Sequence, residues 1–245
     1  MRLLALLVSI IAHACFWNCE SGGYTHNSLA AFRAAGEAGF WGCEFDLNYT
    51  SDGEVFVFHD GTVGGIMFND NPASAFSQCR LKNGEPVPRF EQFLEAAQDY
   101  PQMKLVIEMK FCKTVEMEER FVDTVIEKLR EAGMLNVCRV MFISFSQHIC
   151  SALVERLPGF DVQFIHYGIP LGQIVPIGVS GHDIFNDAAI RNPALVEQAH
   201  RVGLEVNVWT EDDENKIRTL VERGVDYITT NRPDLATRIV SELTL

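Results

Sequence analysis

Residues 42–60 of the 245-residue chain read GCEFDLNYTSDGEVFVFHD. The run opens with a short apolar segment, 42–47, in which two carboxylates, Glu44 and Asp46, stand two residues apart. Successive side chains of a β-strand point to opposite faces, so both carboxylates are expected on one face of a strand. The apolar residues between and beside them would then face the other way. This pattern predicts a buried strand that presents two acids to one side.

The second part of the stretch departs from a simple strand-then-helix order. Ser51-Asp52-Gly53 is a turn signal, and a second strand-like run, Val55–His59, follows it. We therefore expect a hairpin here.

On both sides of this stretch, short apolar runs alternate with helical patterns. The runs predicted as strands are Leu4–Ala12, Gly42–Leu47, Val55–His59, Lys104–Glu108, Arg139–Ser144, Asp161–Ile165, Gly181–Ile184, Glu205–Trp209 and Asp226–Thr229. The runs predicted as helices are Asn27–Ala38, Phe90–Ala97, Val115–Ala132, Ser146–Arg156, Pro193–Val202 and Asp213–Arg223. Such alternation is typical of βαβ units and a parallel sheet.

The number of repeats separates the two main parallel architectures. About eight repeats in a chain of this length favour a closed (β/α)8 TIM barrel, for which roughly 250 residues is typical. The rival, an open doubly wound sheet, usually carries a Gly-x-Gly-x-x-Gly turn after its first strand, and none occurs here. We predict an α/β protein whose residues 1–245 form a single TIM-barrel domain with a small hairpin insertion after strand 2.

Composition narrows the classes of partner. Hydrophobic residues make up 47% of the chain, enough for a large core, and the formal net charge is −13. Binding nucleic-acid backbones needs a basic surface, so a nucleic-acid partner is not expected. The seven cysteines are odd in number and scattered, which favours reduced, partly buried thiols and a reducing compartment.

The N-terminus allows two interpretations. Met1-Arg2 and the apolar run 3–11 resemble a signal peptide, with Ala12-His13-Ala14 as its cleavage site. The same run fits a fully buried first strand. We favour the strand, because cleavage would remove His13, and we predict a cytoplasmic protein; export is the alternative if the run acts as a signal. The run is too short for an integral membrane segment.

Polar residues cluster where predicted barrel strands end, which is where TIM barrels carry their chemistry. Glu44 and Asp46 lie on strand 2, and Glu108 and Lys110 repeat the same spacing on the next barrel strand. Three carboxylates from adjacent strands form an oxygen-ligand set suited to Mg²⁺ or Ca²⁺. A structural ion-pair cluster would give the same pattern.

Two histidines stand at corresponding strand ends. His13 follows strand 1 and His59 follows the hairpin. Imidazole titrates near neutral pH, so the pair are candidate proton donor and acceptor. The other histidines have no motif around them and are interpreted as ordinary, with His182 as a candidate to line the pocket.

Together these residues resemble the glycerophosphodiester phosphodiesterase family, a branch of the phospholipase C-like phosphodiesterases. That family opens with Ala-His-Arg-Gly and Glu-Asn-Thr-Leu-Ala-Ala-Phe, and continues with Glu-x-Asp, Thr-x-Asp-Gly and His-Asp. The matching segments here are 11–15, 26–32, Glu44-Phe45-Asp46, Thr50-Ser51-Asp52-Gly53, His59-Asp60, 83–88, Glu108-Met109-Lys110, 206–210 and 224–233. They span the whole chain in the family's order.

The resemblance implies a metal-dependent hydrolase that releases glycerol 3-phosphate and an alcohol from small-molecule phosphodiesters. It implies general acid–base roles for His13 and His59. The Glu44, Asp46 and Glu108 carboxylates would bind a divalent metal, Mg²⁺ or Ca²⁺ first, with Mn²⁺ and Zn²⁺ as alternatives. Lys110 would face the phosphate. Trp209 would contact the substrate.

Two departures from the family pattern affect the site. Ala14 replaces an arginine that would offer a planar fork of donors to the phosphate. His26 replaces the usual first metal-binding glutamate, and either His26 itself or Glu20, in the enlarged loop before it, is a candidate replacement ligand. A non-catalytic relative that binds phosphate esters, or a phosphodiesterase or lyase with another substrate, is therefore the alternative function. The sequence gives no oligomeric state.

Overall fold

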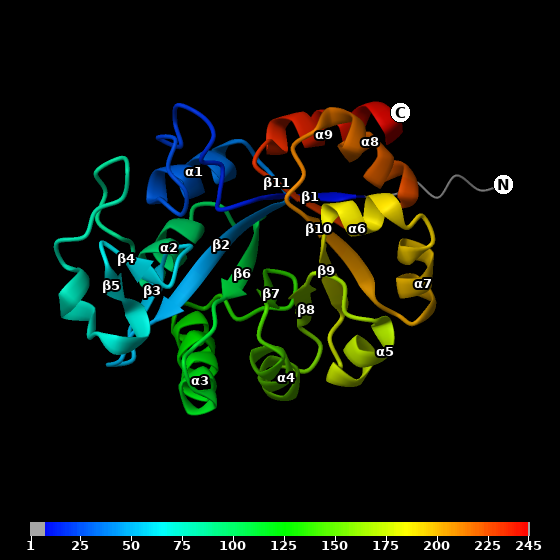
Figure 1. Ribbon diagram of the computed structural model, residues 1–245. Helices are drawn as coiled ribbons and strands as arrows, with labels where there is room; N and C mark the ends of the chain where they lie inside the picture. Colours follow the sequence, from blue (N-terminus) through cyan, green and yellow to red (C-terminus); the bar gives the residue numbers. More distant parts are fainter. Residues whose placement is uncertain (1–7, 245) are drawn as a thin grey trace.

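The computed structural model describes residues 8–244, and its centre is a closed parallel barrel (Figure 1). The sheet order is β1-β11-β10-β9-β8-β7-β6-β2-β3, and an additional β1–β2 pairing closes it. All pairings are parallel except that of β3, which runs antiparallel to β2 outside the ring. Eight strands thus form the barrel, and the predicted TIM-barrel class is confirmed.

The barrel strands fall on the predicted runs. They are β1 (Ser9–Ala12), β2 (Gly42–Tyr49), β6 (Lys104–Met109), β7 (Val140–Ser144), β8 (Asp161–His166), β9 (Gly181–Phe185), β10 (Glu205–Trp209) and β11 (Tyr227–Thr230). Of the predicted first strand, residues 4–7 lie outside the described part of the chain. β1 pairs with both β11 and β2, so it is a full member of the barrel wall.

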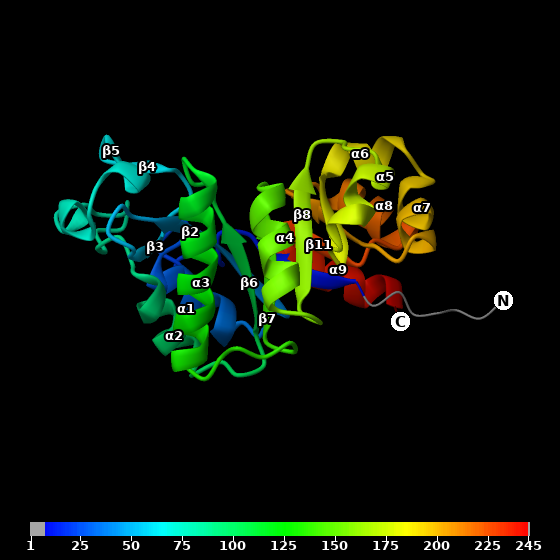
Figure 2. The ribbon, with the colours of Figure 1, turned by 90° about the horizontal axis from the view of Figure 1, so that it is seen from below.

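Helices pack around the outside of this ring (Figure 2). They are α1 (Leu29–Glu37), α2 (Phe90–Ala97), α3 (Val115–Glu131), α4 (Gln147–Arg156), α5 (Leu171–Ile174), α6 (Asn186–Arg191), α7 (Leu195–Arg201), α8 (Glu214–Arg223) and α9 (Pro233–Thr244). Side-chain caps fix several starts: Ser28, Thr114, Ser146 and Asp213 each accept a bond from a backbone N–H of the first turn. Among residues 8–244, no helix has the length and apolar character needed to cross a membrane.

The predicted hairpin is present, and the insertion that contains it is larger than expected. β3 (Val55–Val57) pairs with β2 across the turn. Beyond it lie β4 (Thr62–Val63), β5 (Ile66–Met67) and the 3₁₀ turns η1 (Phe68–Asp70) and η2 (Ala73–Phe76). This segment has a small apolar core of its own, built from Phe56, Val63, Phe68, Ala73, Phe76, Leu81 and Val87. It places residues 59–61 beside the mouth of the barrel.

The barrel interior is divided along its axis. Its apolar cluster consists of Ile11, Val106, Met141, Ile143, Ile165 and Tyr227. Toward the carboxyl ends of the strands, charged and polar side chains replace these residues. The main apolar core lies instead between the strands and the surrounding helices.

Candidate active site

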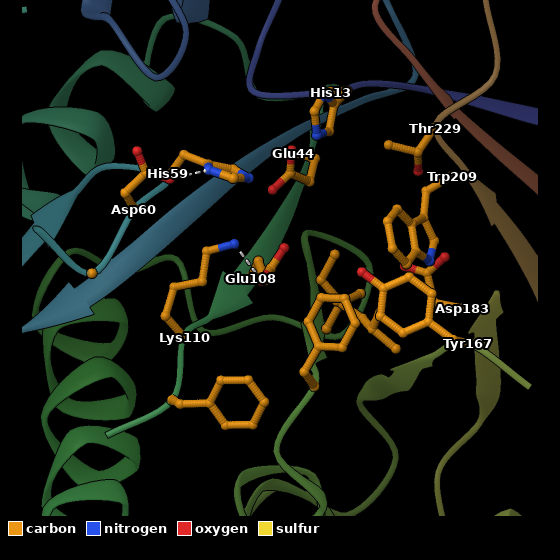
Figure 3. A pocket seen from close by; sticks show the side chains of 15 residues that line it. His13, Glu44, His59, Asp60, Glu108, Lys110, Tyr167, Asp183, Trp209 and Thr229 are labelled. Carbon is orange, nitrogen blue, oxygen red and sulfur yellow. Dashed lines mark hydrogen bonds and ion pairs between the residues drawn. The ribbon is translucent and has the colours of Figure 1, made fainter. Parts of the chain in front are cut away.

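A cavity of about 360 Å³ opens at the carboxyl ends of the barrel strands. It is lined by His13, Glu44, His59, Asp60, Gly61, Glu108, Lys110, Phe111, Ile143, Phe145, Ile165, Tyr167, Asp183, Trp209 and Thr229. Figure 3 shows His59, Glu44 and Lys110 on one side of this space, with Tyr167, Asp183 and Trp209 on the other. The cavity therefore has a charged side and a largely neutral one.

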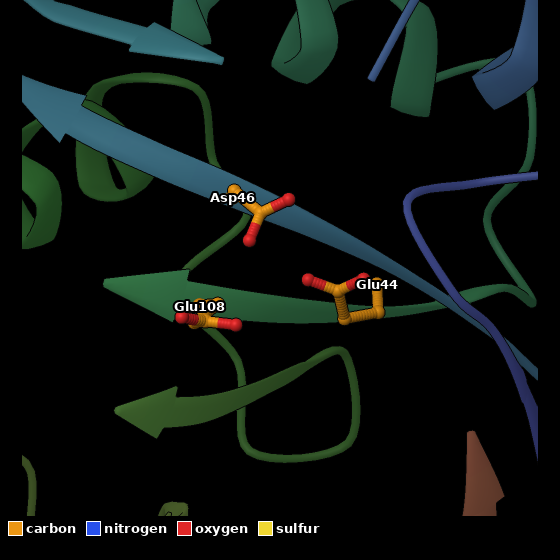
Figure 4. Close-up of side chains that lie close together, drawn as sticks. All are labelled: Glu44, Asp46 and Glu108. Atoms are coloured by element: carbon orange, nitrogen blue, oxygen red, sulfur yellow. The ribbon is translucent and has the colours of Figure 1, made fainter. Parts of the chain in front are cut away.

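The three predicted carboxylates meet on the charged side. Glu44 and Asp46 project from β2 and Glu108 from β6, where Asp46 and Glu108 are register partners (Figure 4). One oxygen from each of the three groups lies within 4.8 Å of the others, and all three residues are buried. Three buried acids at this separation repel one another strongly unless a cation is present.

Lys110 supplies part of the missing positive charge. Its Nζ lies 2.6 Å from Asp46 Oδ1 and 2.6 Å from Glu108 Oε1. With all three carboxylates ionised, as metal ligands must be, they would carry −3 against the +1 of one ammonium, a net charge of −2. Glu44 is outside these ion pairs, and its buried Oε1 has no hydrogen-bond partner among residues 8–244. A divalent cation would balance both the charge and this oxygen.

The pKa values of the cluster reflect the same imbalance. Burial, reinforced by Asp46 and Glu108, raises the pKa of Glu44 well above its usual range. Burial and Asp46 also raise the pKa of Glu108 to about 7, against the opposing effect of Lys110. Burial would raise the pKa of Asp46 too, but Lys110 and His59 lower it to about 2. Burial and mutual repulsion thus disfavour the ionised forms of Glu44 and Glu108, whereas Lys110 and His59 favour the ionised form of Asp46.

Backbone and amide donors hold the acids in place. The Ala14 N–H donates to Glu44 Oε2 at 2.6 Å. Asn27 donates from Nδ2 to Asp46 Oδ2 at 2.6 Å and accepts from the Asp46 N–H at 3.2 Å. Asn27 has φ 55°, a conformation that asparagine tolerates better than most residues. The sequence motif contained Asn27, but nothing in its pattern gave it this role.

Ala14 does not face the cavity. Its side chain is completely buried, its φ is 45°, and its amide is committed to Glu44. An arginine here would have no space beside the pocket without rebuilding the loop. The phosphate-binding role that the family pattern assigns to this position is therefore absent from this geometry.

His13 is held by a chain of hydrogen bonds. Its Nδ1 lies 2.8 Å from Asn231 Oδ1, which also accepts from Trp17 Nε1 at 2.9 Å. The Asn231 amide is oriented by Asp212, which accepts from its Nδ2 at 2.9 Å. Since Asn231 presents an oxygen, His13 carries its proton on Nδ1 and leaves the lone pair on Nε2. Burial lowers the pKa of His13, so this neutral form persists at neutral pH.

His59 lies across the same cavity. Its Nδ1 pairs with Asp60 Oδ1 at 2.8 Å, and both side chains are exposed at the mouth (Figure 3). The adjacent carboxylate favours a proton on Nδ1. The structure thus brings the two predicted histidines to one pocket, beside the carboxylate cluster.

The two candidate replacement ligands lie in the loop before α1. His26 is exposed, with its ring 6.3 Å from that of His13 and 4.0 Å from that of Trp17. Burial, with His13 and His59, lowers the pKa of His26 to about 4. Glu20 is exposed in the same loop. Neither belongs to the group of three acids within 4.8 Å, so their roles as ligands stay predictions.

The sequence analysis predicted only part of the opposite cavity wall. Trp209 lines the cavity as expected, with Ile143, Phe145, Ile165 and Tyr167 around it. Asp183, on β9, also lines it and was missed by the sequence analysis. The expectation for the neighbouring His182 was wrong: strand alternation sends its side chain to the outer face, where it contacts His166.

Comparison with known sequences identifies relatives of this fold. A sequence model described as "Glycerophosphoryl diester phosphodiesterase family" matches residues 19–235. A glycerophosphodiester phosphodiesterase of Caldanaerobacter subterraneus is 24% identical over 243 residues, covering 94% of this chain and 97% of the relative. These matches extend over nearly the full length of both proteins.

Solved structures give the same picture. A glycerophosphodiester phosphodiesterase from Parabacteroides distasonis superposes with a TM-score of 0.92 at 26% identity, covering 98% of this chain and 99% of the other. A phosphodiesterase from Oleispira antarctica, solved in complex with its product sn-glycerol-3-phosphate, superposes with a TM-score of 0.84 at 22% identity, covering 97% and 98%. The second likeness, at its lower identity, concerns the fold.

Proposed function

The chain belongs to the glycerophosphoryl diester phosphodiesterase family of phosphoric diester hydrolases, and we propose that it hydrolyses glycerophosphodiesters to glycerol 3-phosphate and an alcohol. The observation that carries the proposal is the convergence of His13, His59 and Lys110 on one cavity beside three buried carboxylates. The Oleispira antarctica phosphodiesterase, with its bound product, supports a ligand of this size and charge in such a barrel.

A divalent metal fits the carboxylate cluster. Glu44, Asp46 and Glu108 would hold it through oxygen atoms, which suits Mg²⁺ or Ca²⁺, with Mn²⁺ or Zn²⁺ as alternatives. The net charge of the cluster and the unpartnered Glu44 Oε1 support this assignment. When bound, such an ion would supply Lewis-acid stabilisation of the negative charge that develops on the phosphate oxygens.

Lys110 contributes the second positive charge. The Asp46 and Glu108 carboxylates raise its pKa above the usual range although burial opposes them, so the ammonium is permanently charged. It is mostly buried and lines the cavity together with Glu44 and Glu108. A fixed cation in a site with little water stabilises a phosphoryl transition state more than it would in solution.

The positions of the two imidazoles on the cavity wall support roles in proton transfer. His13 carries its proton on Nδ1, so its Nε2 can accept a proton from a nucleophile or pass one to the leaving oxygen. His59, on the other side of Glu44 in Figure 3, would perform the complementary transfer. The nucleophile is either water or a hydroxyl of the substrate, and the second route gives a cyclic phosphate first.

The test is product release by purified protein. We expect glycerol 3-phosphate from glycerophosphocholine and glycerophosphoethanolamine, abolished by EDTA and restored by one or more of Mg²⁺, Ca²⁺, Mn²⁺ and Zn²⁺. Glu44→Ala and His59→Ala should both lose it. Phosphorus NMR of the early product distinguishes a cyclic from a linear phosphate. Absence of release with every metal, from folded protein, would refute the proposed activity.

A further inference from the structure

Five neighbouring strands of the barrel each carry an aromatic side chain at the carboxyl end. Trp209 and Phe185 are the last residues of β10 and β9, and Tyr167, Phe145 and Phe111 follow the ends of β8, β7 and β6 by one or two residues. Parallel strands of a closed barrel bring their carboxyl ends to the same face of the molecule. These five side chains therefore gather at the mouth of the cavity, and we call them the aromatic rim.

The rings of the aromatic rim contact one another in the order of the strands. The distances between ring centroids are 6.3 Å for Phe111–Phe145, 5.8 Å for Phe145–Tyr167, 6.2 Å for Tyr167–Phe185 and 5.7 Å for Phe185–Trp209. Trp209 also meets Phe145 and Tyr167 edge to face, at 5.6 Å and 5.3 Å. Rings at these separations are in packing contact, so they form one continuous apolar surface.

This surface is accessible both from the cavity and from solvent. Phe111, Tyr167 and Phe185 are 60%, 72% and 39% exposed, and they are three of the five exposed aromatic side chains among residues 8–244. Phe111, Phe145, Tyr167 and Trp209 also line the cavity. Single apolar residues are normal on a protein surface, whereas contiguous ones mark a place where a ligand or partner binds. The aromatic rim is therefore a candidate binding surface continuous with the catalytic cavity.

The packing of the rim favours a hydrocarbon over a cationic head group. Recognition of a quaternary ammonium uses ring faces turned toward the cation, whereas the rings here pack against one another. The charged groups of the cavity lie apart from the rim: Figure 3 shows His59 and Glu44 across the cavity from Tyr167. A ligand that spans the cavity thus meets charge at one end and an apolar surface at the other. A phosphate ester with an apolar chain has the same division.

We propose that the aromatic rim binds an apolar chain carried by the substrate, so that the preferred substrates are single-chain amphiphilic phosphodiesters. This inference rests on the proposed function for the phosphodiester itself. The chain belongs either to an acyl group on the glycerol or to the second alcohol, and both present the same hydrocarbon to the rim.

Binding of alkyl phosphates tests the rim without turnover. Calorimetry in the presence of Mg²⁺ measures the Kd of ethyl phosphate and of hexyl phosphate, from dilute solution up to the onset of aggregation. A chain half covered by the open rim should gain about twofold in affinity per methylene, or on the order of tenfold over the four methylenes that separate the ligands. In the double variant Phe111→Ser/Tyr167→Ser, whose two positions are exposed, the ligands should bind within about threefold of each other.

Val137→Ser is the matched control for the loss of exposed apolar surface. Val137 is 45% exposed and precedes β7, at the amino end of the barrel. This variant should keep the wild-type difference between the two phosphates. A difference that survives in the double variant, or that is absent from the wild type, would overturn the proposal. A gain confined to concentrations at which hexyl phosphate aggregates would also overturn it, because the rim would then contact lipid aggregates and not a single chain.

Kinetics locate the chain on the substrate. We would compare kcat/KM for glycerophosphocholine, 1-hexanoyl-glycerophosphocholine and the hexyl ester of glycerol 3-phosphate. A gain for the second compound supports a chain on the glycerol, and a gain for the third supports a chain on the other alcohol. Hydrolysis of glycerophosphocholine with no gain for either chain-bearing ester would overturn this inference and leave the proposed function standing. Chain-dependent binding of the alkyl phosphates without hydrolysis of any ester would support the rim and refute the proposed function.

Discussion

The two sides of the cavity differ in the kind of side chain that they present and in how buried polar groups are paired. On one side, β1, β2 and β6 bring His13, three carboxylates and Lys110 together, and ion pairs offset part of the charge. On the other, the ends of β7 to β10 present apolar side chains together with Asp183 and Trp209, whose Oδ1 and Nε1 atoms have no hydrogen-bond partner in the described part of the chain. The charged side gathers acids whose repulsion a cation would relieve, whereas the neutral side is mainly apolar. The difference teaches that the two sides are best tested by different variants.

The largest effect should come from removing an imidazole on the charged side. His13→Gln and His59→Gln are each expected to lower kcat by roughly 10²–10⁴, the usual contribution of general acid–base catalysis. Steady-state kinetics with glycerophosphocholine measures this. His148→Gln is the matched control, because His148 pairs with Glu119 on the outer helices. A His13 variant with kcat close to that of wild type would remove His13 from the catalytic pair.

A second effect concerns the stability of the metal-free protein. The raised pKa values of Glu44 and Glu108 mean that the folded state holds protons that the unfolded chain releases above about 4.5. For Glu108, stability should therefore fall as the pH rises from about 4.5 to about 7, and the raised pKa of Glu44 acts in the same direction. A divalent cation competes with these protons, so its stabilising effect should grow with pH.

Thermal unfolding near pH 5.5 and pH 8, with and without metal, measures both trends. We expect a larger metal-induced rise in Tm at the higher pH. In Glu44→Gln the metal-free protein should depend less on pH, and the metal should raise Tm much less. A metal effect on Tm that is the same at both pH values, or that survives in Glu44→Gln, would contradict the assignment of these acids.

The smallest of these effects on kcat should come from substituting Asp212, which does not line the cavity. It orients the Asn231 amide and so fixes the proton of His13 on Nδ1. Asp212 accepts from the Thr230 hydroxyl and from the N–H and Nδ2 of Asn231, and asparagine has only one side-chain oxygen to accept with. Losing the bond to Asn231 Nδ2, at about 1.4 kcal/mol, is roughly tenfold in kcat. The pH–rate profile should shift as well, because the His13 tautomer is less strongly enforced. Asp99→Asn, on the surface beside Arg33, is the control, and an unchanged profile in Asp212→Asn would show that Asp212 is only structural.

The charged side could be predicted from the sequence, whereas on the neutral side only Trp209 was predicted. The spacing of Glu44 and Asp46 predicts that both lie on one face of a strand. The resemblance to the family pointed to His13, His59 and Lys110. The face of β9 that points inward depends on register alone, and a shift of one residue exchanges Asp183 for His182. That choice is made by pairing with β8 and β10, which leaves no local signal in the sequence.

Two further misses have identifiable causes. α9 was not predicted, although Pro233 at its start and the buried Leu235, Ala236 and Ile239 form a helical pattern. The role of Ala14 depends on a left-handed backbone conformation, which an alanine in the sequence does not indicate. The first miss overlooked a pattern that the sequence contains, whereas the second depends on a backbone conformation that the sequence does not indicate.

The central claim is that the three carboxylates bind a divalent metal, because the ion pairs of Lys110 leave part of their negative charge unbalanced. Its most direct test is anomalous diffraction from crystals soaked with Mn²⁺ and glycerol 3-phosphate. The account predicts a manganese peak bonded to oxygen atoms of Glu44, Asp46 and Glu108, beside the phosphate. A peak elsewhere, or no peak from protein that hydrolyses the diester in EDTA, would contradict it.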